Sequence, residues 1–237
     1  MTIISLVLVV IALYIILNYQ SQIPTKRLLV LSAAIGVFSS ITHLYIIKTV
    51  STVALGWYVF YSVFYTSIFM SAYIMAGRTE LPIFWGKASK LKQVFISIII
   101  GIFIAIILIL LKNIRMGNQL FKWQGLIDSF KNTGYHFWYG FINSVQAGIT
   151  EEILFRFCLI TLTVFLLNKS KLTQRHKLCI AILISSVVFA LVPMHHFLLT
   201  FIVGLILAYS YLKLGLIPVI IIHFLVDAIQ FYVYLLS

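Results

Sequence analysis

The chain has 237 residues, of which 62% are hydrophobic and only 9% are charged. Soluble domains average about 45–50% apolar and about 25% charged residues, so this composition excludes an ordinary soluble protein and is typical of a polytopic membrane protein. The formal net charge is +12, but the basic residues cluster in short gaps between apolar runs, which indicates loops beside anionic lipid rather than nucleic-acid binding.

Apolar runs long enough to cross a bilayer recur along the whole chain. None alternates like a strand, so the spans should be helices, whose backbone groups are satisfied internally. We expect an all-α helical bundle of about eight transmembrane helices, near residues 3–18, 28–47, 53–75, 94–111, 135–167, 178–197, 198–212 and 216–236. They form one membrane domain, with N-terminal spans in 1–130 and a motif-bearing core in 131–237.

Two segments depart from simple spans. Between Lys112 and Lys131, apolar residues recur at helical spacing among polar ones, which favours an amphipathic helix lying in the membrane interface. The run 135–167 exceeds one crossing, so it should be tilted, kinked or projecting at one end. Most Lys and Arg residues follow the first, third, fifth and seventh runs, so the positive-inside rule places both termini outside.

Ionisable groups occur within three of the predicted spans, where each one costs about 2.5–3.5 kcal/mol on insertion scales. They use three of the only five acidic residues in the chain. If only one such pair of ionisable groups were present, a purely structural ion pair between two helices would explain it equally well. Three clusters favour a functional site, which comprises Glu151, Glu152 and Arg156, then His195 and His196, then His223 and Asp227.

Helical spacing predicts how two of these clusters pair. Glu152 and Arg156 are four residues apart, so they share a helix face and can form an ion pair. Glu151 is rotated by about 100° from its neighbour, so it is left free. His223 and Asp227 have the same spacing, so the carboxylate can accept a hydrogen bond from the imidazole and orient it.

A free carboxylate and an oriented imidazole are the parts needed to hydrolyse an amide. Glu151 could deprotonate water as a general base. A histidine could steady that water or, with the carboxylate, hold a zinc ion. Other polar groups could donate to the oxyanion of the intermediate. The sequence contains neither His-Glu-x-x-His nor Gly-x-Ser-x-Gly, so the two commonest hydrolase signatures are absent.

These motifs resemble the CPBP group of intramembrane proteases, named for CAAX proteases and bacteriocin-processing proteins and also called Abi. The first motif of that group, Glu-Glu-x-x-x-Arg, is matched by 151–156, and the last, His-x-x-x-Asp/Asn, by 223–227. The segments 201–204 and 211–215 resemble the usual approach to the final histidine helix. The resemblance covers roughly residues 140 to 230.

The middle motif departs from the pattern of the group, which is Phe-x-x-x-His after a serine pair. Ser185, Ser186 and Phe189 are present, but the position four past the phenylalanine is Pro193. By helix phase His196 returns to the expected face, whereas a bulge at the proline would deliver His195. Both histidines stay open as the middle-motif residue.

The resemblance implies an intramembrane endopeptidase of the cell membrane that cuts a membrane-associated or lipidated protein or peptide. Glu151 would be the water-activating base, supported by Glu152 with Arg156, and the middle histidine would contact the water. His223 and Asp227 would stabilise the oxyanion or orient the site. Members process prenylated CAAX proteins or bacteriocin precursors, or confer bacteriocin immunity.

The resemblance leaves several properties open. It fits a metal-free glutamate protease as well as a metalloprotease, in which Glu151, His196 and His223 would bind Zn²⁺. The altered middle motif also fits a non-catalytic immunity or regulatory protein on the same scaffold. A third reading is an ion-coupled transporter with Glu151, Glu152 and Asp227 as a relay, although the halves of the chain show no recognisable repeat.

Overall fold

The computed structural model describes residues 2–19, 25–46, 52–115, 137–191 and 197–236. Every regular element within these ranges is helical, so the predicted all-α fold is confirmed. The elements are α1 (Thr2–Asn18), α2 (Thr25–Ile46), α3 (Thr52–Thr79), α4 (Lys90–Arg115), α6 (Phe137–Glu151), η2 (Glu152–Ile160), α7 (Thr161–Leu167), α8 (Gln174–Leu191), α9 (Phe197–Leu214) and α10 (Leu216–Leu236).

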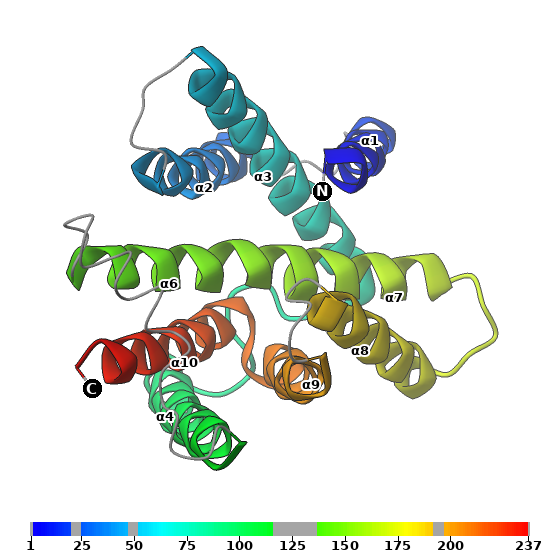
Figure 1. Cartoon of the computed structure of the whole chain (residues 1–237). Coiled ribbons are helices and arrows are strands. Elements are labelled where there is room, and N and C mark those ends of the chain that lie inside the picture. The colour runs from blue at the N-terminus through cyan, green and yellow to red at the C-terminus, as the bar shows by residue number, and fades with distance from the viewer. Residues whose placement is uncertain (1, 20–24, 47–51, 116–136, 192–196, 237) are drawn as a thin grey trace.

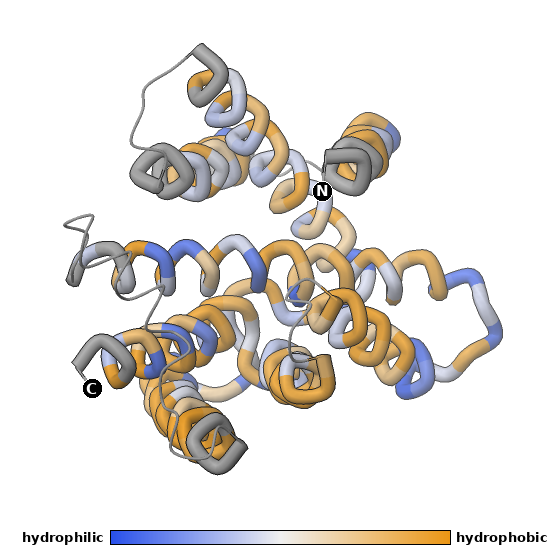
Figure 2. The backbone as a smooth tube through the Cα atoms, viewed as in Figure 1, coloured by the Kyte–Doolittle hydropathy of each residue, from blue (hydrophilic) through white to orange (hydrophobic). Residues whose placement is uncertain are grey.

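The helices correspond to the eight predicted runs, with α6, η2 and α7 together forming the fifth. By length and composition, five described helical segments could cross a membrane, namely 55–79, 90–111, 174–191, 197–214 and 216–233. Figure 2 shows α4 as hydrophobic along most of its length and a hydrophilic stretch between α7 and α8. The predicted interfacial helix falls almost wholly within 116–136, outside the described residues.

The described part of the long run, residues 137–167, keeps one direction instead of kinking. In Figure 1, α6 and α7 form one continuous rod, with α1, α2 and most of α3 on one side and α4, α8, α9 and α10 on the other. Its middle third, η2, is a π-helix, a rare, wider turn that is often found at functional sites. The excess length is therefore absorbed partly by a wider helix, which hydropathy could not reveal.

Hydroxyl groups bond several carbonyls of this π-helix. Ser185 of α8 donates to the Phe155 carbonyl at 2.7 Å, and Thr161 donates to the Cys158 carbonyl at 2.9 Å. A buried carbonyl without a partner costs free energy comparable to a lost hydrogen bond. Neighbouring side chains thus stabilise the wide turn, and α8 is tied to it directly.

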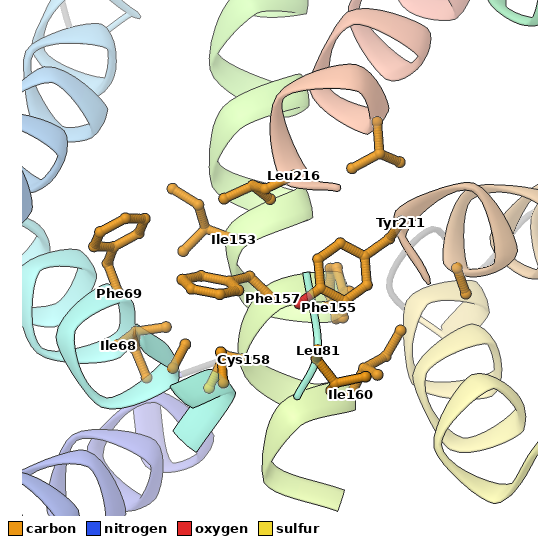
Figure 3. Packing of buried hydrophobic residues seen from close by; sticks show 14 of the residues in the cluster. Ile68, Phe69, Leu81, Ile153, Phe155, Phe157, Cys158, Ile160, Tyr211 and Leu216 are labelled. Carbon is orange, nitrogen blue, oxygen red and sulfur yellow. The ribbon is translucent and has the colours of Figure 1, made fainter. Parts of the chain in front are cut away.

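The hydrophobic core is shared between the N-terminal and C-terminal halves of the chain. Figure 3 shows Phe69 of α3, Phe157 of η2 and Tyr211 of α9 gathered around the rod. The Phe157 ring is 5.3 Å from that of Phe69 and 6.5 Å from that of Tyr211, centroid to centroid, and all three side chains are buried. The rod is therefore fixed from several sides by packing.

Small residues allow α6 and α10 to approach closely. Gly140, Ser144 and Gly148 are spaced by four, which is the small-residue pattern of tightly packed membrane helices. A Cβ atom on Gly148 would lie 3.2 Å from the Ile220 carbonyl oxygen and 3.3 Å from the Phe224 amide nitrogen. This close approach sets the distance between the end of α6 and the middle of α10, where two predicted site residues lie.

We therefore expect Gly148→Ala to lower the free energy of unfolding by about 1–3 kcal/mol, as overpacked cores do. The added methyl group meets backbone atoms, which cannot move aside as a flexible side chain does. Gly77→Ala in α3 is the matched control, because a Cβ there meets nothing within 4 Å. Denaturant unfolding in detergent micelles measures both variants, and equal stabilities would contradict the close-packing argument.

The loop between α3 and α4 holds the first turn of α10. The amides of Leu216 and Ile217 donate to the carbonyls of Ile83 and Phe84, each at 3.1 Å, and the Gly86 amide donates to the Leu214 carbonyl at 2.6 Å. The first amides of a helix have no partner inside the helix. The loop supplies partners for two of them, and so fixes the start of the helix that carries His223.

Candidate active site

The two adjacent glutamates lie at the junction of two helix types and in different surroundings. Glu151 is the last residue of α6 and Glu152 the first of η2. The Glu151 side chain is 36% exposed, whereas that of Glu152 is 0% exposed. Two neighbouring carboxylates thus have unequal access to solvent.

Glu152 is held from two sides. Its Oε2 atom is 3.3 Å from Nε of Arg156, whose side chain is also 0% exposed. Its Oε1 atom is 2.6 Å from Nδ1 of His223 on α10. A carboxylate only accepts hydrogen bonds, so Nδ1 carries the hydrogen and donates it. One buried carboxylate therefore orients both a guanidinium and an imidazole.

The opposite edge of the imidazole faces two further carboxylates. Nε2 of His223 lies 3.5 Å from Oδ2 of Asp227 and 3.8 Å from Oε2 of Glu151. The Asp227 side chain is 37% exposed, much like that of Glu151. The site is thus layered, with Glu152 and Arg156 buried behind the imidazole and Glu151 and Asp227 in front of it.

The structure brings together five of the seven predicted site residues. The Glu152–Arg156 ion pair is present at the predicted spacing. The predicted pairing of His223 with Asp227 is present at 3.5 Å, but the imidazole also makes a shorter, unpredicted hydrogen bond to Glu152. Sequence reasoning missed it because those residues are 71 positions apart and no local spacing joins them. His195, His196 and Pro193 lie outside the described residues, so the middle motif stays a prediction.

The zinc prediction likewise stays a prediction. Within the described ranges, no group of three or more His, Cys, Asp or Glu side chains is arranged to hold a metal ion. Two of the predicted ligands, Glu151 and His223, are 3.8 Å apart at their nearest atoms. The third, His196, is not described.

A further polar side chain near Glu151 comes from the N-terminal half. Tyr65 of α3 is 9% exposed, and its hydroxyl group interacts with that of Thr150, the residue before Glu151. Tyr65 belongs to no sequence motif, and tyrosine is frequent in this chain. The sequence therefore contained no signal that would have separated Tyr65 from the other tyrosines of α3.

Fold and site together define a multi-pass helical membrane protein in which carboxylates from one helix meet an imidazole from another. Comparison with protein families adds a match of residues 133–229 to the family described as Type II CAAX prenyl endopeptidase Rce1-like. Over this segment the chain is similar to the Rce1-like CAAX endopeptidases, and the resemblance inferred from the motifs is confirmed there. Comparisons with curated proteins and with solved structures gave no match.

Proposed function

We propose that this protein is an intramembrane endopeptidase that hydrolyses a peptide bond of a membrane-associated or lipidated substrate. The observation that carries the proposal is the imidazole of His223, bonded through Nδ1 to buried Glu152 and facing Glu151 with Nε2. Such an arrangement combines an oriented imidazole with a more exposed carboxylate. The Rce1-like match over the same residues supports this reading.

In the proposed reaction, Glu151 is the general base. A water hydrogen-bonded to its carboxylate loses a proton to Glu151 as the water oxygen attacks the carbonyl carbon of the peptide bond. Glu151 then passes that proton to the leaving amine as the carbon–nitrogen bond breaks. The exposure of its side chain fits this role, because the base must reach both water and substrate.

His223 is the group placed to stabilise the developing oxyanion. In its doubly protonated form, the imidazole keeps its Nδ1–H bond to Glu152 and donates Nε2–H toward the carbonyl oxygen. Glu152 and Arg156 fix the ring from behind, and Asp227 flanks the donating nitrogen. No step in this scheme depends on a metal ion; Zn²⁺, if held by Glu151, His196 and Nε2 of a neutral His223, would instead supply polarisation of the water, and that nitrogen would then not donate to the oxyanion.

The test is hydrolysis by the purified protein in proteoliposomes, using a prenylated peptide that ends in a CAAX sequence and the same peptide without the lipid. In H₂¹⁸O, mass spectrometry should find one ¹⁸O atom in the new carboxyl group of the prenylated peptide. His223→Gln should remove nearly all of this product. His176→Gln is the matched control, since His176 is exposed at the start of α8.

Hydrolysis by His223→Gln at the wild-type rate would contradict the proposal. If the wild type cleaved neither peptide, and proteome comparison of membranes with and without the protein found no processed substrate, the non-catalytic alternative would replace it. The dependence of hydrolysis on zinc is tested separately, by adding a metal chelator. Loss of activity with chelator and its recovery with added Zn²⁺ would support a metalloprotease, and unchanged activity a glutamate protease.

A further inference from the structure

Arg156 is the most completely buried cation among the described residues. Its side chain is 0% exposed, and Nε alone faces Glu152, at 3.3 Å. Within the described part of the chain, none of its three side-chain nitrogens makes a hydrogen bond, so its contact with Glu152 is an ion pair. Burying a guanidinium is costly unless something else compensates it. Among the described residues, no second carboxylate is in salt-bridge contact with it.

An aromatic ring lies beside the guanidinium of Arg156. The guanidinium carbon of Arg156 lies 4.1 Å from the ring centroid of Phe189 on α8, which is within cation–π range. The ring of Phe155 is farther away, at 5.9 Å. Phe189 therefore supplies the closest aromatic face to this cation, from a helix other than the one that carries Arg156.

The same ring also contacts the imidazole. Phe189 and His223 meet edge to face, with centroids 6.0 Å apart and planes at 88°. Glu152 thus forms an ion pair with the guanidinium and a hydrogen bond with the imidazole, while Phe189 packs against both of these groups. A single aromatic side chain therefore contacts both groups that Glu152 binds.

Phe189 is itself fixed in position. A Cβ atom on Gly204 of α9 would lie 3.2 Å from its Cδ1 atom, so the glycine leaves room for the ring. Ser185, one turn earlier on α8, donates to the Phe155 carbonyl of η2. Phe155 in turn packs against Phe189 with ring centroids 5.3 Å apart. The ring is held between α8, α9 and the π-helix.

We propose that Phe189 is a positioning residue that holds the Arg156 guanidinium against Glu152 and keeps the His223 imidazole in its orientation. This inference rests on the proposed function for its catalytic consequence, but its structural content stands apart from it. The ring acts through its π face, not only through its volume. An unbranched apolar side chain of similar size at position 189 should not perform this role, whereas a different aromatic side chain at that position should.

The test compares Phe189→Met, which removes the ring, with Phe189→Tyr, which keeps it. Phe157→Met is the control for ordinary core loosening, because that buried ring packs on Phe69 and Tyr211 instead. With the prenylated CAAX peptide, kcat should fall about tenfold in Phe189→Met while KM stays unchanged. Phe189→Tyr should restore kcat, and Phe157→Met should retain it.

A spectroscopic measurement separates this proposal from the proposed function. The imidazole proton resonances of His223, identified by their loss in His223→Gln, should shift in Phe189→Met because the ring current disappears. They should stay in place in Phe157→Met. Unmoved His223 resonances in Phe189→Met, or equal losses of kcat in Phe189→Met and Phe157→Met, would overturn the role of Phe189. If the wild type hydrolyses no peptide, the proposed function fails. The shift of the His223 resonances then decides alone whether Phe189 positions the imidazole.

Discussion

Glu151→Gln should lower the rate of peptide hydrolysis by about 10²–10⁴-fold, which is the usual contribution of a general base. Glutamine keeps the shape of the side chain but cannot accept the proton of water. The Glu151 side chain is 36% exposed and its nearest imidazole atom is 3.8 Å away, so little packing is lost. Binding of the uncleaved peptide should therefore persist.

The measurement is a steady-state rate in proteoliposomes, accompanied by denaturant unfolding of the same preparation. Glu80→Gln is the matched control, because Glu80 is an exposed glutamate that follows α3 and lies outside the site. It should cleave as the wild type does. A Glu151→Gln variant with an undiminished rate would remove Glu151 from the proposed chemistry, whatever its stability.

Arg156→Met should instead lower stability, by about 3–5 kcal/mol, which is typical when one member of a buried ion pair is removed. Methionine leaves the Glu152 carboxylate 0% exposed without its guanidinium partner. The hydrogen bond from His223 remains, but the ion pair with the guanidinium is lost. Denaturant unfolding in detergent measures the effect.

The double variant Glu152→Gln with Arg156→Met tests whether the loss of stability comes from the unpaired charge. Exchanging both members of a buried pair for neutral groups of similar size is often far less destabilising than removing one. The double variant should therefore recover much of the stability without recovering hydrolysis, because Glu152 also orients His223. If Arg156→Met unfolded at the same denaturant concentration as the wild type, the buried pair would not be a stabilising feature.

Hydrophobicity was sufficient to predict the helical architecture, because a bilayer imposes a minimum length on each apolar run. Residue spacing was sufficient for the Glu152–Arg156 pair, which depends only on helix geometry. The hydrogen bond between Glu152 and His223 depends on how two distant helices pack, and no periodicity encodes that. The same holds for the loop carbonyls of Ile83 and Phe84 that receive the first amides of α10.

Two further features were hidden for a different reason. Tyr65 is an ordinary residue in a chain rich in aromatic side chains, so only its contacts distinguish it; the middle motif marked Phe189, but not its contacts with Arg156 and His223. The π-helix at 152–160 has no hydropathy signature, because a wider turn contains the same residue types as a narrow one. Charged groups were conspicuous in this sequence, whereas the neutral groups that position them were not.

The hydrogen bonds between residues 83–86 and 214–217 bear on how far the protein can be shortened. The family match begins at residue 133, yet the first turn of α10 takes its partners from the loop after α3, and α3 packs against η2. A gene that encodes only the matched segment would lack both supports. Truncated versions and chimaeras with foreign N-terminal spans should therefore keep residues 52–115 together with the matched segment.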